Sequence, residues 1–167
     1  MLVRTEQVMD ASKIHAINRA AFDSATEAGI VDALRSDVEN VISLVAEEHG
    51  EIVGHIMFSP VQLTGAADVR AMALAPMAVT PERQRAGIGS ALVRAGLEEC
   101  RRLGIDAVFV VGHPTYYPRF GFKSASRAGF VCEFEVPDEV FMVAELVTGV
   151  LDRKTATVHF HPAFKEG

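Results

Sequence analysis

The chain has 167 residues, a formal net charge of −6 and hydrophobic side chains at 49% of its positions. This length and composition predict one soluble globular domain over residues 1–167, large enough to bury a core without disulfide or metal support. No apolar run approaches the ~20 residues of a membrane span, and the negative charge disfavours nucleic-acid binding. Two separate cysteines, Cys100 and Cys132, and the lack of a secretory signal lead us to expect a cytoplasmic protein.

The N-terminal part is predicted to form one short strand and two helices. Leu2–Thr5 favours a strand, and Asp10 or Ser12 is a candidate cap for a helix that ends near Phe22. Apolar residues recur at helical spacing within that segment, as in an amphipathic helix. A second helix is expected over Thr26–Leu34.

The clearest hairpin signal follows. Two strand-like segments, Val41–Glu47 and Glu51–Ser59, are separated by His49-Gly50. Arg70–Val79 is predicted as the next strand, and it contains Pro76. Because proline donates no hydrogen bond to a strand ladder, Pro76 indicates an edge, a bulge or a place where two strands part.

Beyond a central helix, the C-terminal half predicts a buried strand, a short helical segment and further strands. Asp106–Val111 is apolar enough for a strand buried on both faces. Phe130–Val136 and Val140–Val147 are predicted strands joined by Pro137-Asp138, and Val158–Phe160 is one further short strand. The order of the elements indicates an α+β, or mixed α/β, fold around one central sheet.

The segment from Gln84 to Gly89 is the most informative, because it ends a predicted strand and opens a predicted helix. Apolar residues repeat at helical spacing after it, up to Leu103. Unpaired N–H groups and the helix dipole at such a start favour an anion, most obviously a phosphate, and glycines let it approach the backbone. Arg83 and Arg85 are either further phosphate contacts or solvated loop charges.

Two common phosphate-binding motifs do not fit this turn. A Rossmann fingerprint needs a third small residue where Leu92 stands, and an acid after the next strand, whereas Asp106 stands before it. The P-loop pattern is excluded because no Gly-Lys-Ser/Thr follows. The residues alone therefore predict a diphosphate-binding helix start without a signature for nucleotide hydrolysis or hydride transfer.

The stretch Met77–Val93 (MAVTPERQRAGIGSALV) resembles the acetyl-CoA signature of the GNAT superfamily of N-acetyltransferases. That signature reads Gln/Arg-x-x-Gly-x-Gly/Ala, and Gln84, Gly87 and Gly89 fill it. Many members also have a tyrosine four positions before a Gly-Phe pair, as Tyr117 is here. The sequence around this second motif, HPTYYPRFGF at residues 113–122, is similar to that of a bacterial branch of predicted acetyltransferases.

The resemblance covers roughly residues 1–136, and it implies a mostly antiparallel, twisted central sheet that splays after its fourth strand and is flanked by helices. It implies acetyl-CoA as cosubstrate, with the pantetheine arm in the splay, and no metal. Backbone groups of the strand would hold the thioester, and those of the turn would bind the diphosphate. The cofactor-binding residues so implied are Met77, Ala78, Val79, Gln84, Arg85, Ala86, Gly87, Ile88, Gly89 and Ser90.

Acetyl transfer to an amine needs a proton donor for the departing thiolate, and the resemblance implies Tyr117 in that role. A phenol can reach the sulfur and give up its proton. The alternative is that Tyr117 only packs against the cofactor or the core. Tyr116 is the main competitor for the role.

The general base is harder to assign. Some relatives place a glutamate on the strand before the signature, but Ala71–Val79 carries no acidic side chain. The amine proton is expected to leave through water or to reach Glu27, Asp23 or His113. Glu27 is the catalytic candidate because the second helix in this fold tends to line the acceptor site; its alternative is a solvated helix carboxylate.

The predicted activity is acetyl transfer from acetyl-CoA to a primary amine by direct attack in a ternary complex. The alternative is a catalytically idle acyl-CoA-binding regulatory module of the same fold, which the missing strand acid favours. The acceptor is a small-molecule or peptide amine, no nucleic-acid or membrane partner is expected, and the resemblance implies a homodimer. His159 and His161 are interpreted as strand-surface residues, because a metal site would need further ligands.

Overall fold

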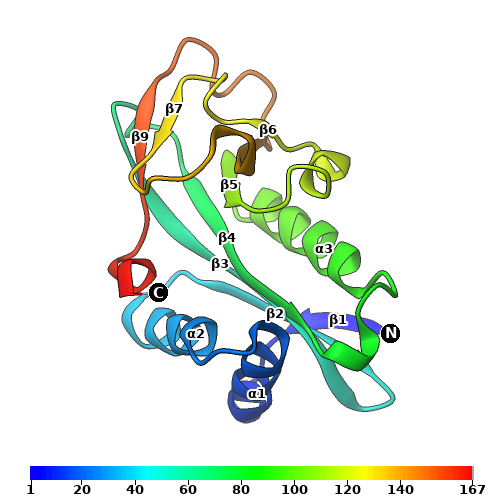
Figure 1. Ribbon diagram of the computed structural model, residues 1–167. Coiled ribbons are helices and arrows are strands. Elements are labelled where there is room, and N and C mark those ends of the chain that lie inside the picture. The colour runs from blue at the N-terminus through cyan, green and yellow to red at the C-terminus, as the bar shows by residue number, and fades with distance from the viewer. Residues whose placement is uncertain (167) are drawn as a thin grey trace.

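A nine-stranded, mostly antiparallel sheet runs through the computed structural model, which describes residues 1–166, and three α-helices cover it (Figure 1). The strands are β1 (Leu2–Thr5), β2 (Ile42–Glu48), β3 (Glu51–Thr64), β4 (Ala71–Val79), β5 (Ala107–Val111), β6 (Lys123–Ser124), β7 (Phe130–Cys132), β8 (Phe141–Glu145) and β9 (Ala156–His159). The helices are α1 (Ala11–Phe22), α2 (Thr26–Asp37) and α3 (Ile88–Arg102), with short 3-10 turns η1 (Val8–Asp10), η2 (Pro81–Arg83), η3 (Tyr117–Phe120), η4 (Asp138–Val140) and η5 (Pro162–Glu166). The strand order is β1-β2-β3-β4-β5-β8-β6, and β9 pairs with β3 and β7.

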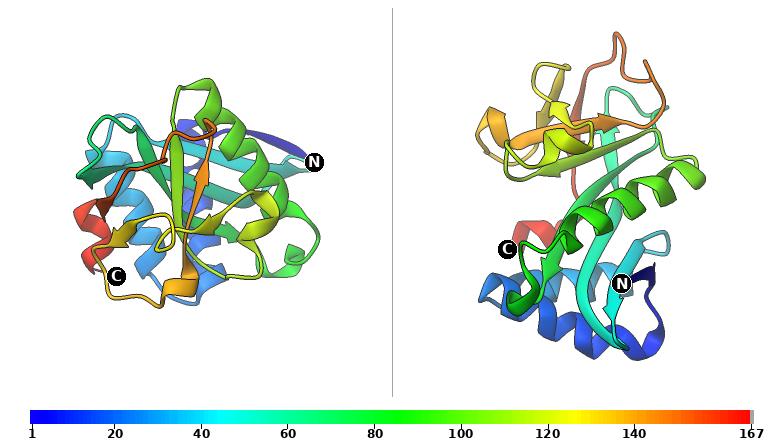
Figure 2. Two further views of the ribbon diagram at one scale, coloured as in Figure 1. Left: turned by 90° about the horizontal axis from the view of Figure 1, so that it is seen from above. Right: turned by 90° about the vertical axis from the view of Figure 1, so that its right-hand side faces the viewer.

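The two faces of the sheet are covered by different helices, as the side view in Figure 2 shows. On one face, Leu92 and Leu97 of α3 share a core cluster with Ile56 and Phe58 of β3. On the other face, α1 and α2 bury Met57 of β3. Successive β3 residues therefore point to opposite faces and are buried on both, because a sheet between two helix layers has no solvent face there.

The sheet splays between β4 and β5, as predicted. These strands are parallel and pair only over residues 71–73 of β4, so the rest of β4 has no strand neighbour on that side among the described residues. A register shift between Ile56 and Phe58 of β3 places a bulge at Pro76. Proline is tolerated there because a bulged or unpaired position needs no ladder donor. The outer part of β4 therefore presents free backbone groups to the gap.

The predicted N-terminal elements are confirmed. The strand, the two helices and the hairpin lie where the sequence placed them, apart from small differences at their ends. At the hairpin turn, His49 and Gly50 have positive φ angles of 51° and 79°, as a tight two-residue β-turn requires. β3 continues past its predicted end at Ser59 to Thr64, because its last residues pair with β9.

The C-terminal strands differ from the prediction. The segment expected as one strand over Phe130–Val136 forms β7 only to Cys132, and β7 pairs in parallel with β9 rather than with β8. Phe134 and Val136 are partly buried against the core outside any strand, so loop packing produced their alternating pattern. β8 pairs instead with β5 and with the two-residue strand β6, which sequence analysis did not predict.

Within residues 1–166, no helix combines the length and apolar character needed to cross a bilayer. Both cysteines are free, with Cys100 buried in α3 and Cys132 half-buried. Burial raises the pKa of the Cys100 thiol to about 12. Because thiolates rather than thiols are nucleophilic, Cys100 is an inert core residue at neutral pH.

Candidate functional site

The glycine-rich turn shapes the start of α3. Gly87 is its N-cap, with a positive φ of 87°, and Arg85 also has a positive φ, of 64°. Ile88 is buried and anchors the first turn, while the Ala91 N–H donates to the Gly87 carbonyl at 3.1 Å. The N–H groups before Ala91 have no acceptor within the helix, so this end of α3 is suited to an anion.

Three elements meet at Gly89. A Cβ there would lie 3.2 Å from Tyr116 Oη and 3.4 Å from Met77 Cε, so even a methyl group would contact the ends of both side chains tightly. Met77 lies in the splayed part of β4, and Tyr116 directly precedes η3. The Tyr116 hydroxyl also lies 3.2 Å from Ser90 Oγ. The strand end and the helix start that were predicted to bind the cofactor are therefore in contact.

The polar side chains of the turn have different partners. Arg83 forms a two-point ion pair with Glu48, with Nε–Oε1 and Nη2–Oε2 distances of 2.7 and 2.8 Å, and this contact lowers the pKa of Glu48. Gln84 donates from Nε2 to the Val79 carbonyl at 3.0 Å. Arg85 is exposed and forms no ion pair among the described residues. Of the two arginines considered for phosphate binding, Arg83 is therefore engaged by Glu48.

Tyr117 is buried beside the splay, with 8% of its surface exposed. Its ring packs edge-on against Tyr116 and Phe122, at centroid distances of 5.1 and 5.5 Å. A Cβ at Gly112 would lie 2.4 Å from Tyr117 Cε2, so the glycine after β5 makes room for the ring. Burial, with a smaller effect of Tyr116, raises the pKa of Tyr117 to about 12. The phenol is thus protonated at neutral pH and is chemically a proton donor.

Glu27 does not lie beside Tyr117. It is half-buried in the first turn of α2, on the face of the sheet opposite to α3 (Figure 1). Its side chain forms no hydrogen bond or ion pair within residues 1–166. His113 is exposed, and its carbonyl oxygen accepts hydrogen bonds from the N–H groups of Tyr116 and Tyr117, at 3.1 and 3.4 Å. β4 carries no acidic side chain, so no residue of this strand is placed to receive the amine proton.

The histidines near the C-terminus have separate acidic neighbours. His159 ends β9 with its Nδ1 3.7 Å from a Glu133 carboxylate oxygen, and His161 lies after the strand with its Nε2 3.7 Å from Asp37. His161 is therefore not a strand residue, contrary to the prediction. In the part of the chain that the structure describes, no three His, Cys, Asp or Glu side chains are grouped closely enough to hold a metal ion.

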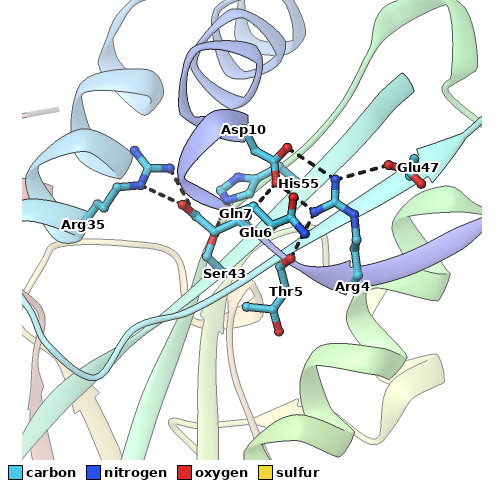
Figure 3. A network of polar contacts seen from close by, with 9 residues as sticks. All are labelled: Arg4, Thr5, Glu6, Gln7, Asp10, Arg35, Ser43, Glu47 and His55. Carbon is cyan, nitrogen blue, oxygen red and sulfur yellow. Dashed lines mark hydrogen bonds and ion pairs between the residues drawn. The ribbon is translucent and has the colours of Figure 1, made fainter. Parts of the chain in front are cut away.

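A buried polar chain, which sequence analysis missed, lies on the face covered by α1 and α2 (Figure 3). His55 of β3 is fully buried and stands opposite Ala78 of β4 in the sheet register. Asn18 Nδ2 donates to the Ile14 carbonyl at 3.0 Å and lies 3.3 Å from His55 Nδ1. Because that amide nitrogen can only donate, Nδ1 of His55 acts as an acceptor.

The polar groups on the other side of the His55 ring are consistent with the same tautomer. His55 Nε2 lies 2.8 Å from Ser43 Oγ, and Ser43 donates to Glu6. Both Glu6 carboxylate oxygens accept from Arg35, at 2.9 and 3.1 Å. His55 is therefore a neutral imidazole with its proton on Nε2, and burial lowers its pKa to about 4. A lone histidine in an apolar strand gives no signal for partners that come from other elements.

We expect this histidine to make stability depend on pH. Folding lowers the pKa of His55 from 6.5 to about 4, so between these values the unfolded chain binds a proton that the folded chain excludes. The free energy of unfolding should therefore fall as the pH decreases from 6.5 towards 4, by at most about 1.4 kcal/mol per unit. Well above pH 6.5 His55 is neutral in both states and adds no pH dependence to the free energy of unfolding. Urea titrations at pH 5, 6 and 7 measure the slope.

The matched variant for this experiment is His55→Gln, which keeps a donor and an acceptor but does not titrate. Its stability should be lower overall and should depend less on pH over the same range. Equal slopes in the variant and the wild type would assign the acid sensitivity to another group.

The chain is similar to known proteins over most of its length. A profile of the family described as "Acetyltransferase (GNAT) domain" matches residues 3–125. The chain is 34% identical over 165 residues to the uncharacterized N-acetyltransferase YhbS of Escherichia coli, covering 98% of both chains. It is 41% identical over 134 residues to a second uncharacterized N-acetyltransferase of E. coli, YjhQ, with 78% of this chain and 74% of that protein covered.

Two solved structures share the fold over nearly the whole chain. The crystal structure of the GNAT family N-acetyltransferase YhbS from E. coli in complex with CoA has a TM-score of 0.93 and 33% identity, covering 98% of this chain and 91% of that one. A GNAT family acetyltransferase from Brucella melitensis in complex with acetyl-CoA has a TM-score of 0.81 and 36% identity, covering 98% and 97% of the two chains.

Proposed function

Because the chain belongs to the GNAT acetyltransferase family, we propose that it transfers the acetyl group of acetyl-CoA to a primary amine. The two similar crystal structures are complexes with CoA and acetyl-CoA. One observation in this chain carries the proposal. At Gly89 the start of α3, with its unpaired N–H groups, comes within side-chain contact of Met77, in the part of β4 that has no strand neighbour on one side.

The two parts of acetyl-CoA match these two features. Its diphosphate suits the N–H groups of residues 85–90, at the positive end of α3. Its pantetheine arm is an extended chain with amide groups, and it would pair with those backbone groups of residues 77–79 that point away from β3, much as an added strand does. Binding along both features would leave the thioester beside β4, on the side where Tyr117 is buried.

The proposed reaction is direct attack within a ternary complex. A neutral amine forms a C–N bond to the thioester carbon, and backbone N–H groups of β4 stabilise the tetrahedral oxyanion. Collapse breaks the C–S bond, and the Tyr117 hydroxyl supplies the proton that the thiolate needs. A covalent acyl intermediate on Cys100 is disfavoured, because this thiol is buried and has a pKa of about 12.

The amine must also lose a proton, and we propose that water carries it from the splay to Glu27. No acid lies on β4, and Glu27 is half-buried on the helix layer that faces the acceptor side in this proposal. Glu27→Gln should then slow the amine-dependent rate without changing the Kd for acetyl-CoA. An unchanged rate would exclude Glu27 as the acceptor of the amine proton.

The function is tested by thiol release from acetyl-CoA in the presence of an amine panel. The panel contains alkylamines, amino acids, peptide N-termini and lysine side chains, with tertiary amines and alcohols as matched controls. We expect thiol release and an acetylated product with primary amines only. Binding of acetyl-CoA without turnover across the whole panel would contradict the enzymatic proposal and favour an idle acyl-CoA-binding module.

A further inference from the structure

Tyr116 and Tyr117 are adjacent in sequence, but their hydroxyl groups have different surroundings. The Tyr117 ring is enclosed by the core, whereas Tyr116 is half-buried and reaches the first turn of α3. There its Oη lies 3.2 Å from Ser90 Oγ, and a Cβ at Gly89 would lie 3.2 Å from the same oxygen. The Tyr116 hydroxyl therefore belongs to the helix start that binds the diphosphate in the proposed function.

Two contacts hold Arg119 over Tyr116. The guanidinium carbon lies 4.7 Å from the centroid of the Tyr116 ring, and Arg119 Nε donates to the Tyr116 carbonyl oxygen at 2.9 Å. These contacts use a single N–H group, so the two terminal amino groups of the planar fork remain as donors. Arg119 is exposed and forms no ion pair within residues 1–166.

A second arginine without a carboxylate partner lies next to this pair. Arg94 follows Ser90 by about one turn of α3, and its guanidinium carbon lies 5.1 Å from the centroid of the Phe120 ring. It too forms no ion pair among the described residues. Arg83, in contrast, is bound at two points by Glu48. Although the chain has a net charge of −6, positive charge is therefore available on the η3 side of the α3 start.

We propose that Tyr116 and Arg119 form a second wall of the phosphate site, donating from η3 to a phosphate group of CoA that the α3 backbone binds from the other side. An arginine fork and a phenol suit this task, because phosphate oxygens accept several directed, charge-assisted hydrogen bonds. The proposal rests on the proposed function. It gives Tyr116 a role in binding and leaves proton donation to Tyr117.

CoA carries phosphate at two places, the diphosphate and the ribose 3′ position, and the experiment separates them. The Kd values of CoA and 3′-dephospho-CoA are measured by calorimetry for the full chain and for Arg119→Met and Tyr116→Phe. We expect Arg119→Met to raise the Kd for CoA by about tenfold or more, and Tyr116→Phe by about threefold to tenfold. An equal rise for both ligands assigns the contact to the diphosphate, and a rise for CoA alone assigns it to the 3′-phosphate.

Arg19→Met is the matched control, because Arg19 is exposed on α1 and forms no ion pair among the described residues. It removes the same charge on the opposite face of the sheet and should leave both Kd values unchanged. The ratio of the Kd of Arg119→Met to that of the wild type should also fall at high salt, since exposed charges are screened. Arg119→Lys should recover part of the affinity.

Three results would overturn the inference: no rise in Kd for Arg119→Met, an equal rise for Arg19→Met, or a Kd ratio of Arg119→Met to wild type that salt does not alter. If Tyr116→Phe does not fold, Arg119→Met still decides the question, because that side chain is exposed. A wild-type chain that binds neither ligand would refute the proposed function itself. Normal wild-type binding with unaffected variants would refute only the second wall.

Discussion

Replacing Tyr117 with phenylalanine is expected to lower kcat by about a hundredfold or more and to leave the Kd for acetyl-CoA nearly unchanged. The change removes only the hydroxyl, so the ring keeps its contacts with Tyr116 and Phe122. The departing thiolate must then take its proton from water. Because the pKa of Tyr117 is raised to about 12, ionisation of the wild-type phenol should not limit the rate in the neutral range.

The measurement is kcat at saturating amine, together with a calorimetric Kd for acetyl-CoA. Tyr116→Phe is the matched control, because it removes a hydroxyl from the neighbouring ring and should weaken binding without lowering kcat. If Tyr117→Phe keeps kcat within about threefold of wild type, Tyr117 is not the acid. A kcat loss in Tyr116→Phe alone would move that role to Tyr116.

Replacing Gly89 with leucine should raise the Kd for acetyl-CoA by about a hundredfold or more. A Cβ at this position already lies 3.2 Å from Tyr116 Oη and 3.4 Å from Met77 Cε. The longer side chain would fill the space between β4 and the helix start, where the cosubstrate is proposed to lie. Leucine also favours helix more than glycine does, so α3 is not weakened through its helix propensity.

Gly29→Leu provides the control for this variant. Gly29 is an exposed glycine of α2, and no heavy atom lies within 4 Å of a Cβ built there. The substitution should leave the affinity for acetyl-CoA at its wild-type value. Equilibrium dialysis with labelled acetyl-CoA compares the two variants, and wild-type affinity in Gly89→Leu would remove the helix start from the binding site.

Local signals explain which elements were predictable. The helices α1, α2 and α3 repeat their apolar residues at helical spacing, and the hairpin turn has the His49-Gly50 pair that a tight turn needs. Pro76 predicted an edge, a bulge or a parting of strands, because its missing donor constrains where it can lie, and the structure has a bulge there and a splay beside it. The β7–β9 pairing was missed because a parallel partner distant in sequence leaves no local mark, and a packed loop imitates strand alternation at Phe134.

The local geometry of the candidate site was predictable where it depends on neighbouring residues. The turn that opens α3 was identified from its own residues, since Gly87 and Gly89 have local backbone and steric requirements. The ion pair of Arg83 was not, because Glu48 lies 35 residues away in sequence. The partners of His55 were hidden for the same reason. Sequence patterns locate backbone features well, and they leave open which charged side chains neutralise one another.

Calorimetric titration of acetyl-CoA into the wild-type chain tests the central claim most directly. The account predicts saturable binding with one acetyl-CoA per chain, and an affinity that falls as salt is raised, because the diphosphate would meet the helix dipole and exposed arginines. A chain that is folded by circular dichroism but shows no saturable binding would contradict it.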